Sequence, residues 1–377
     1  MSIPTATTTL LILCTIFTPL HLKANAVKCH PDDEAGLLGF KPGIKSDPSG
    51  MLSKWIRGTN CCTISLGGQP EQPNSFLSGT ISSSLSKLQF LDGIYFTNLR
   101  NISDGIQNLK SLTYLSLQGN QLSGNILDFF TSLKNLRFLE LSRNKFFGTI
   151  PASIATLAPI LGYLELGQNS LSRKIPDFLG KMKALDTLDL SSNRFTGSVP
   201  QSFKNLMKIF NLNLSNNLLV DPFPQMNVKG IESLDLSNHN LHLGIIPKWV
   251  TSSPVIYSLK LAKCGIRMKL DDWKPSETYF YDYIDLFGND ISGSAIGLLN
   301  RTDYLVGFWA SGNKLKFDMG GLRIAEKLKY LDLSRNSVFG KIAKGVVGLQ
   351  KLNIQFPASA FAGNDCLCGP SLQPCIA

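Results

Sequence analysis

Apolar residues recur along most of this chain in short alternating runs, and the segment 185–200, LDTLDLSSNRFTGSVP, shows the pattern most clearly. Side chains alternate across a strand, so leucines at 185, 188 and 190 share one side while Thr187 and Asp189 share the other. Asn193 follows where the chain must turn, and its amide can satisfy backbone groups there. Pro200 keeps the return arm from forming a helix at that point. The pattern predicts a short strand with a buried side and a displayed side.

The same arrangement returns about every two dozen residues, which is the signature of a leucine-rich repeat. A single such coil cannot bury its own apolar side, whereas a stack of coils can. The sequence therefore predicts one solenoid rather than several domains, an α/β repeat fold that is right-handed with a concave parallel β-sheet. With strands about 4.8 Å apart, eleven coils make a curved rod roughly 50 Å long. The turn position is occupied in order by Leu99, Asn120, Asn144, Asn169, Asn193, Asn217, His239, Cys264, Asn289, Asn313 and Asn336.

The displayed strand positions form two columns that are candidates for a binding face. One column is mainly acidic, and a partial aromatic column runs beside it. Aromatic residues beside charges are typical of protein-binding surfaces. The framework alternative stays open, because solvated carboxylates on a strand need no function. The candidate residues are Tyr114, Phe138, Glu140, Tyr163, Glu165, Asp189, Asp235 and Asp285, and the acidic column also includes Ser116, Asn213, Lys260, Trp309 and Asp332.

The N-terminal segment 1–26 is expected to be a secretory signal peptide. It contains a short apolar stretch, LLILCTIF, and the small residues Ala24 and Ala26 precede the expected cleavage site before Val27. No later stretch approaches the roughly 18 apolar residues of a spanning helix. We expect a secreted chain without a transmembrane segment after cleavage.

Removal of this segment leaves 36 basic and 27 acidic residues, a net charge of +9. A basic exported protein is attracted to polyanions, and acidic polysaccharides such as pectin are the polyanions of a cell wall. Nucleic acid is not an expected partner, because the chain lacks a basic-aromatic binding motif.

Cysteine-containing segments at both ends are expected to cap the stack. Residues 27–66 contain a helix that Asp32 can cap, with Ala35, Leu38 and Leu37 as candidates for its inward face. Residues 67–355 carry the repeats, and residues 356–377 form the second cap. A cap is needed because each terminal coil otherwise exposes core to water.

The opening KCHPDDEAGLLGFKPGI, the GTIP and GSVP sequences and the closing NDCLCGPSLQPC resemble plant extracellular leucine-rich-repeat proteins. The resemblance covers essentially the whole chain after the signal. It is greatest to the polygalacturonase-inhibitor-like group and to receptor-like protein ectodomains. It implies an apoplastic or cell-wall location, a second small sheet at the GxIP segments, and disulfides Cys29–Cys61 and Cys368–Cys375.

The chain after the signal contains seven cysteines, an odd number for an oxidising compartment. Cys264 occupies a turn position, where a buried free thiol is an ordinary structural choice. The pairing implied by the resemblance leaves Cys62 and Cys366 unpaired at opposite ends of the rod. We expect both to be free or to form intermolecular bonds.

No nucleophile, phosphate-loop or metal-binding motif accompanies the few histidines, so we expect neither catalysis nor a cofactor. The carboxylates are expected to lie in an open ladder with no group of raised pKa. The favoured function is recognition of an extracellular protein, a wall-degrading enzyme or a receptor ectodomain, in defence or development. A structural wall protein held by acidic polysaccharide and a co-receptor for a membrane receptor kinase remain alternatives. Glycans are expected at Asn101, Asn213 and Asn300.

Overall fold

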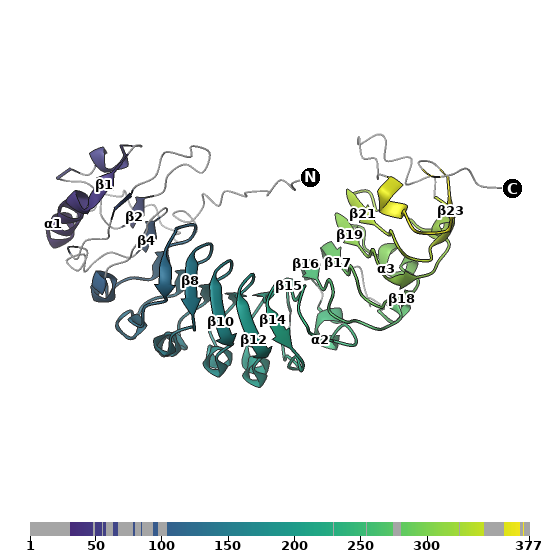
Figure 1. The fold of residues 1–377 in the computed structure, drawn as a ribbon, viewed down its shortest axis with the longest axis horizontal. Helices are drawn as coiled ribbons and strands as arrows, with labels where there is room; N and C mark the ends of the chain where they lie inside the picture. Colours follow the sequence, from purple (N-terminus) through teal and green to yellow (C-terminus); the bar gives the residue numbers. More distant parts are fainter. Residues whose placement is uncertain are drawn as a thin grey trace, which may run out of the picture.

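The chain forms a curved stack of coils (Figure 1). A computed structural model describes residues 31–47, 50–54, 56–57, 63–66, 78–79, 84, 93–96, 104–228, 230–253, 255–273, 280–323, 325–342, 358–369 and 372. Leu99, Asn101, Cys29, Cys61, Cys62 and Cys375 and the expected signal peptide lie outside these residues.

Twelve strands of the described residues form one parallel sheet in chain order, and this sheet lines the concave side (Figure 1). Parallel, in-register pairing of successive coils is what the repeat predicts, and the predicted solenoid is confirmed. The strands are β2 (Thr63–Leu66), β4 (Gly93–Phe96), β5 (Tyr114–Ser116), β7 (Phe138–Glu140), β9 (Tyr163–Glu165), β11 (Thr187–Asp189), β13 (Asn211–Asn213), β15 (Ser233–Asp235), β16 (Val255–Lys260), β17 (Phe280–Asp285), β19 (Gly307–Trp309) and β21 (Tyr330–Asp332).

A second parallel sheet of five strands follows the turns of successive coils, as the GxIP resemblance implied. It ends at β14, and in the described residues beyond it the coils pair as isolated bridges, such as Val220 with Asn240, and as short two-stranded sheets. The five strands are β6 (Ser123–Asn125), β8 (Lys145–Gly148), β10 (Ser170–Lys174), β12 (Arg194–Ser198) and β14 (Leu218–Val220). The short pairs are β18 (Ser292–Gly293) with β20 (Lys314–Leu315), β22 (Phe339–Lys341) with β23 (Cys366–Cys368), and the antiparallel β1 (Ile44–Ser46) with β3 (Ser78–Gly79).

Short helices return the chain along the convex side. Several start directly after a proline at the N-cap position, where the backbone is not yet helical and the φ of −56° to −69° is the value that the proline ring fixes. They are η4 (Asp104–Asn108), η5 (Phe130–Ser132), η6 (Ala152–Leu157), η7 (Asp177–Lys181), η8 (Gln201–Asn205), α2 (Lys248–Thr251), η9 (Leu270–Asp272), α3 (Ile296–Leu299), η10 (Met319–Gly321) and, near the C-terminal end, η12 (Ala358–Phe361).

The core is a column of apolar side chains contributed one per strand by the inward position. Their burial gives the fold its main stabilisation, since apolar surface removed from water contributes about 25 cal/mol per Å². Each of the following is at most 4% exposed: Leu115, Leu139, Leu164, Leu188, Leu212, Leu234, Leu259, Ile284, Phe308 and Leu331.

Asparagines at the turn positions hold successive coils together. The Nδ2 of Asn193 donates to the carbonyls of Leu190 and of Leu166 in the preceding coil, at 3.1 and 3.0 Å. Its Oδ1 accepts from the N–H of Leu171 at 2.9 Å. One side chain thus satisfies buried backbone groups of two coils, which explains why the position favours asparagine.

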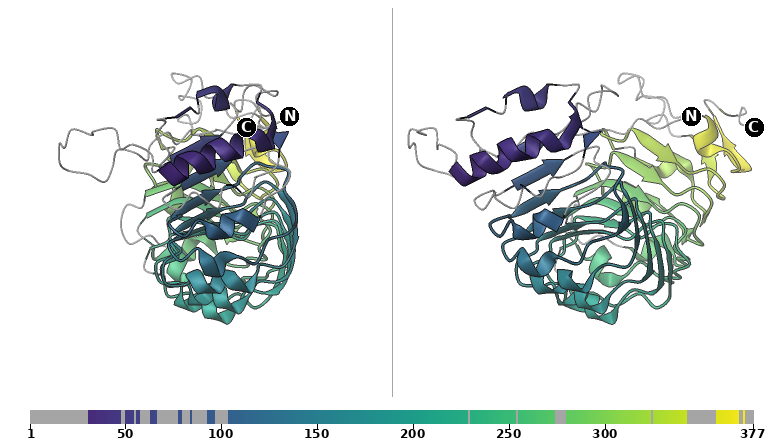
Figure 2. Two further views of the ribbon diagram at one scale, coloured as in Figure 1. Left: turned by 90° about the vertical axis from the view of Figure 1, so that its left-hand side faces the viewer. Right: turned by 60° about the vertical axis from the view of Figure 1, so that its left-hand side comes forward.

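Helix α1 (Pro31–Phe40) lies at the N-terminal end of the stack, beside the first strands (Figure 2). It buries Leu37 and Phe40, whereas Ala35 is exposed and Leu38 is half-buried. The expected inward face was therefore wrong for Ala35 and Leu38. The helix also begins at Pro31, so Asp32 lies within its first turn rather than at a capping position before it. With η1 (Lys41–Gly43) and η2 (Met51–Lys54), α1 makes up most of the described N-terminal segment.

Candidate protein-binding face

The concave sheet presents two rows of side chains, because each strand pairs with the next residue for residue. We call the row two residues before the end of each strand the upstream row, and the row at the last residue of each strand the downstream row. The upstream row is Tyr114, Phe138, Tyr163, Thr187, Asn211, Ser233, Ser258, Tyr283, Gly307 and Tyr330. The downstream row is Ser116, Glu140, Glu165, Asp189, Asn213, Asp235, Lys260, Asp285, Trp309 and Asp332.

Three neighbouring aromatic rings occupy the N-terminal end of the upstream row. The ring centroids of Tyr114 and Phe138 are 5.9 Å apart, and those of Phe138 and Tyr163 are 5.5 Å apart. Phe138 remains 37% exposed. The hydroxyl of Tyr114 donates to Oε2 of Glu140 at 3.0 Å, which ties the aromatic row to the acidic one. This end of the sheet therefore offers apolar and anionic groups side by side.

Glu165 lies between two other carboxylates of the downstream row, Glu140 and Asp189, on adjacent strands. Burial, and then the negative charges of Glu140 and Asp189, raise the pKa of Glu165 to about 7, while Arg143 acts in the opposite direction. The expectation of a solvated ladder with no raised pKa was wrong. Carboxylates one strand apart shield each other from water, and a sequence pattern does not show that crowding.

The aspartates of the downstream row also have a framework role. Oδ1 of Asp189 accepts from the N–H of Ser191 at 2.7 Å, and Asp235 and Asp285 make the same bond to residues 237 and 287. Burial raises the pKa of Asp189 and of Asp285, against these hydrogen bonds. A glutamate carries its carboxylate one methylene farther, so Glu140 and Glu165 extend beyond this local turn.

The predicted site residues do not form one continuous cluster. The structure brings together Tyr114, Phe138, Tyr163, Glu140, Glu165 and Asp189, which we call the acidic-aromatic patch. Asp235 is separated from it by Asn213, and Asp285 lies farther along, beyond Lys260. Ser116, expected to project outward, is fully buried, and its hydroxyl has no hydrogen-bond partner in the described part of the chain.

Sequence reasoning missed Arg143, the cation that acts on Glu165 and Asp189. It directly precedes a turn asparagine and has a φ of 57°, in the left-handed region. The same conformation recurs before other turn positions, at Gln168, Ser192 and Asn216. Arg143 could have been found from the spacing of the repeats, because the residue before each turn asparagine follows the downstream strand position by three residues.

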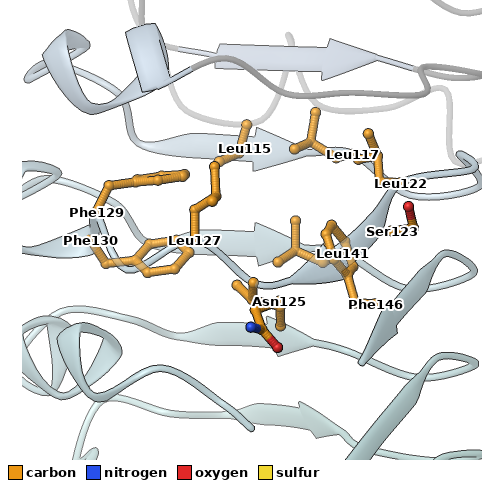
Figure 3. A pocket seen from close by; sticks show the side chains of 11 residues that line it. Leu115, Leu117, Leu122, Ser123, Asn125, Leu127, Phe129, Phe130, Leu141 and Phe146 are labelled. Atoms are coloured by element: carbon orange, nitrogen blue, oxygen red, sulfur yellow. The ribbon is translucent and has the colours of Figure 1, made fainter. Parts of the chain in front are cut away.

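A small cavity of about 100 Å³ lies beneath the sheet between β5 and β7. Its lining is almost entirely apolar and includes Leu115, Leu141, Phe130 and Phe146 (Figure 3). Ligand pockets usually enclose about 300–1,000 Å³, so this space is a packing gap of the core. The open concave face remains the candidate site.

Two of the expected glycan acceptors lie in described segments. Asn213 lies on β13, where its Oδ1 accepts from the N–H of Ser215 at 3.2 Å. Asn300 follows α3 in a connection, and its Oδ1 accepts from the N–H of Arg323 at 2.8 Å. In both, a glycan on Nδ2 leaves the bond to the amide oxygen in place. The Nδ2 of Asn300 also donates to the carbonyl of Gly321 at 3.3 Å, and a glycosylated amide keeps one N–H for that bond.

The cysteines of the described segments differ in their surroundings. Cys264 is a free thiol, fully buried, and burial raises its pKa to about 12, which makes it chemically inert. Cys366 is free and exposed, and Cys368 is disulfide-bonded. The predicted pairings stay predictions, because Cys29, Cys61 and Cys375 are outside the described residues.

Known protein families match the chain in several segments. A leucine-rich repeat N-terminal domain matches residues 30–65, and leucine-rich repeats match residues 111–133, 135–157 and 159–219. Leucine-rich repeat protein FLOR 1 of Arabidopsis thaliana is 31% identical over 118 residues, 26% of this chain and 35% of that protein. Polygalacturonase inhibitor 1 of Phaseolus vulgaris is 29% identical over 112 residues, 25% of this chain and 33% of the inhibitor. The matched part spans about a third of each relative.

Solved structures show the same solenoid. The ectodomain of the Arabidopsis thaliana receptor kinase GASSHO1/SCHENGEN3, in complex with CASPARIAN STRIP INTEGRITY FACTOR 2, superimposes with a TM-score of 0.60 at 25% identity. The superposition covers 84% of this chain and 43% of the ectodomain. Within the described residues, no helix is long and apolar enough to cross a membrane.

Proposed function

We propose that this chain, a leucine-rich-repeat protein similar to plant extracellular leucine-rich-repeat proteins, binds a secreted protein through the acidic-aromatic patch and performs no catalysis. The partner is a wall-degrading enzyme with a basic surface, and the setting is the apoplast, in plant defence. Similarity to a polygalacturonase inhibitor makes a polygalacturonase the first candidate.

The observation that carries this proposal is the crowding of three carboxylates beside three aromatic rings on an open face. Arg143 is the cation that acts on Glu165, against three carboxyl groups, so the patch carries an excess of negative charge on a protein that is basic overall. That excess is largest above about pH 7, where Glu165 ionises. Complementary charge steers a basic partner to the face, and aromatic anchors hold it once water is expelled. The open form of the face suits a protein better than a small molecule.

The main alternative is a wall protein retained by pectin through its basic surface. Lysines of the convex side, Lys181 and Lys183, are exposed and available for such contacts. Receptor ectodomains share the fold, so a role beside a membrane receptor kinase is a further alternative. The pectin alternative predicts that the convex lysines control binding and that the acidic-aromatic patch does not.

Binding kinetics against a secreted endo-polygalacturonase with a basic surface test the proposal. Tyr163→Ala should mainly raise the dissociation rate, because it removes an anchor. Measured at pH 8, where Glu165 is ionised, Glu165→Lys should mainly lower the association rate and the salt dependence, because it replaces a steering carboxylate by an ammonium group. Both side chains face outward from the strand, so neither change should unfold the protein.

Tyr330→Ala is the matched control, an aromatic of the same row at the far end of the sheet. A pectate column run with the same variants and with the Lys181→Gln/Lys183→Gln protein separates the alternative. If both concave variants bind the enzyme like the parent protein while the lysine variant loses pectate retention, the wall-protein alternative replaces the proposal.

A further inference from the structure

A second group of aromatic rings occupies the C-terminal end of the concave sheet, four strands or more from the acidic-aromatic patch. Trp309 lies between Tyr283 and Tyr330, with ring centroids 6.2 and 5.8 Å apart. The ring planes are within 19° and 20° of parallel. Nearly parallel rings at this separation are offset rather than face to face, so part of each ring stays uncovered.

Gly307 makes this row continuous. A Cβ at position 307 would lie 2.4 Å from Cη2 of Trp309, so the indole lies over the glycine. In the upstream row, residue 307 stands between Tyr283 and Tyr330. The indole of Trp309 therefore fills the place that a side chain at 307 would take, and three successive strands each present a ring. We call these three residues the aromatic strip.

A second pair of rings extends this surface toward the start of the strands. Phe280 and Tyr304 have centroids 4.8 Å apart and are 45% and 39% exposed. The ammonium of Lys327 lies 4.5 Å from the centroid of Tyr304. Among the side chains that the structure describes in β16, β17, β19, β21 and the turn before β19, the large exposed hydrophobic ones are all aromatic. The exposed Met207, Leu218, Val220 and Ile245 lie in other elements.

Charges of both signs surround the aromatic strip and nearly balance. The carboxylates in these strands or next to them are Asp282, Asp285, Asp303, Glu326 and Asp332, and the cations are Lys260, Lys327, Lys329 and Arg323, which pairs with Asp303. The acidic-aromatic patch has no such balance. A ligand of the strip consequently gains little from net charge of either sign.

We propose that the aromatic strip binds a neutral oligosaccharide with flat, equatorially substituted pyranose rings, such as a β-1,4-linked glucan. The apolar C–H face of such a sugar packs on an aromatic face, and offset rings on successive strands present several such faces in a line. The carboxylates of Asp285 and Asp332 flank the strip and accept hydrogen bonds from sugar hydroxyls.

Other ligand classes fit these observations less well. A polyuronate gains no net attraction from the mixed charges, and its carboxylates would lie next to Asp285 and Asp332, which flank the rings. A cationic ligand competes with the protein's own ammonium groups, since Lys327 already lies over Tyr304. A protein partner normally meets aliphatic as well as aromatic anchors, and the strip offers only rings. This inference concerns the other end of the sheet and does not rest on the proposed function.

Tryptophan fluorescence of the full secreted chain provides the test. Trp249 and Trp273 are buried at 8% and 3% exposure, whereas Trp309 lies on the open face. Titration with cellohexaose and with a xyloglucan heptasaccharide should give a saturable change in emission. Hexagalacturonate at the same concentrations should give none.

Calorimetric titration of variants then assigns the site. Trp309→Ala and Tyr330→Ala should each weaken cellohexaose binding about tenfold or more, whereas the matched Tyr163→Ala should bind like the parent. Circular dichroism melts check that the variants are folded, and Tyr330→Phe should retain binding because the ring remains. The proposal is overturned if neither neutral glycan binds, if hexagalacturonate binds instead, or if folded Trp309→Ala and Tyr330→Ala bind like the parent. The proposal is also overturned if these variants lose polygalacturonase binding and no neutral glycan binds the parent, because the strip then belongs to a protein partner.

Discussion

At the scale of single residues, Arg173 shows how the coil imposes a backbone conformation that its side chain disfavours. It stands two residues before Ile175 with a φ of 73°, where the neighbouring coils have Gly148 and Gly197 with φ of 81° and 75°. A left-handed conformation costs a non-glycine residue about 1–2 kcal/mol. Glycine avoids this cost, but its greater conformational freedom in the unfolded state offsets part of the advantage. Arg173→Gly should stabilise the protein by about 0.5–1 kcal/mol, measured by urea unfolding.

The opposite substitution in the next coil is the control. Gly197→Ala should destabilise, because its φ is disfavoured and the new Cβ would lie 3.1 Å from Cγ of Lys174. If Arg173→Gly lowered the midpoint of unfolding, or Gly197→Ala left it unchanged, the conformational account of these positions would be wrong.

The raised pKa of Glu165 predicts a pH dependence of stability. The folded pKa is about 7 against an ordinary value of 4.5, so the folded state binds the extra proton within that window. The stabilisation is fully present below pH 4.5 and is lost as pH rises through 7. Glu165→Gln removes this loss and should raise stability at pH 8 by about 1–3 kcal/mol relative to the parent.

Glu140→Gln provides a graded comparison, because it removes one of the charges that raise the pKa of Glu165. It should reduce the pH dependence without abolishing it. Denaturant titrations at pH 4.5 and pH 8 give the free energy of unfolding of each protein at both pH values. An equal change of this free energy between the two pH values in all three proteins would contradict the electrostatic coupling of the row.

The sequence predicted which residues share the concave face but not how crowded they are. Alternation along a strand places Glu140, Glu165 and Asp189 on one side, and that much follows from the repeat. The burial of Ser116 and the raised pKa of Glu165 arise from neighbours on adjacent strands, whose side-chain packing the repeat pattern does not specify.

At the scale of the element, the asparagine ladder is interrupted in two successive coils. Cys264 partly replaces asparagine, since its Sγ donates to the carbonyl of Leu236 at 2.9 Å. His239 does so poorly, because its ring nitrogens are buried and make no hydrogen bond of good geometry among the described residues, and the backbone of Asn217 is the one group close enough to act as a weak acceptor. Burial lowers the pKa of His239 to about 4. Beyond β14, directly before this coil, the second sheet ends.

His239→Asn should restore the missing rung and stabilise the protein by about 1–2 kcal/mol at neutral pH, since the amide can serve backbone groups of two coils. The parent protein should lose stability as pH falls from 6.5 through 4, because His239 is protonated in the unfolded state but stays neutral in the folded state over this range. The advantage of the variant should therefore grow in that window by up to about 3 kcal/mol. Thermal melts at pH 7.5 and pH 4 test this, and a constant difference between them would contradict it.

The repeat pattern predicted every rung from Asn120 to Asn336 but not Asn364. Its Nδ2 donates to the carbonyls of Leu333 and Phe361, at 3.0 and 2.9 Å, and Val338 donates to its Oδ1. The ladder thus continues into the segment assigned to the C-terminal cap. The longer spacing of 28 residues and the neighbouring cysteines concealed this rung in the sequence.

At the scale of the whole molecule, one continuous sheet carries two chemically different ends. The acidic-aromatic patch and the aromatic strip are separated by strands whose upstream row is small and polar, with Thr187, Asn211, Ser233 and Ser258. Side chains several coils apart couple weakly in a solenoid, because each coil contacts mainly its neighbours. The two surfaces can therefore be altered independently, which allows one to serve as a control for the other.

A glycan placed on the sheet tests the central claim most directly. Asp189→Asn creates an Asn-Leu-Ser acceptor in the acidic-aromatic patch, and Asp332→Asn creates the same sequence at the far end. Asn213, on β13, carries this sequence naturally with the same turn hydrogen bond that Asp189 and Asp332 make to residues 191 and 334. Both substitutions keep the accepting oxygen, so the fold should be preserved. The Asn213→Gln background removes the native acceptor on this face.

The measurement is polygalacturonase binding by each glycosylated variant. Mass spectrometry establishes the glycan occupancy, and enzymatic deglycosylation then tests whether removal of the glycan restores binding. The Asp189→Asn glycoform should lose binding and should recover most of it after deglycosylation, while the Asp332→Asn glycoform should bind like the background. Undiminished binding by the fully glycosylated Asp189→Asn protein would contradict recognition through the acidic-aromatic patch.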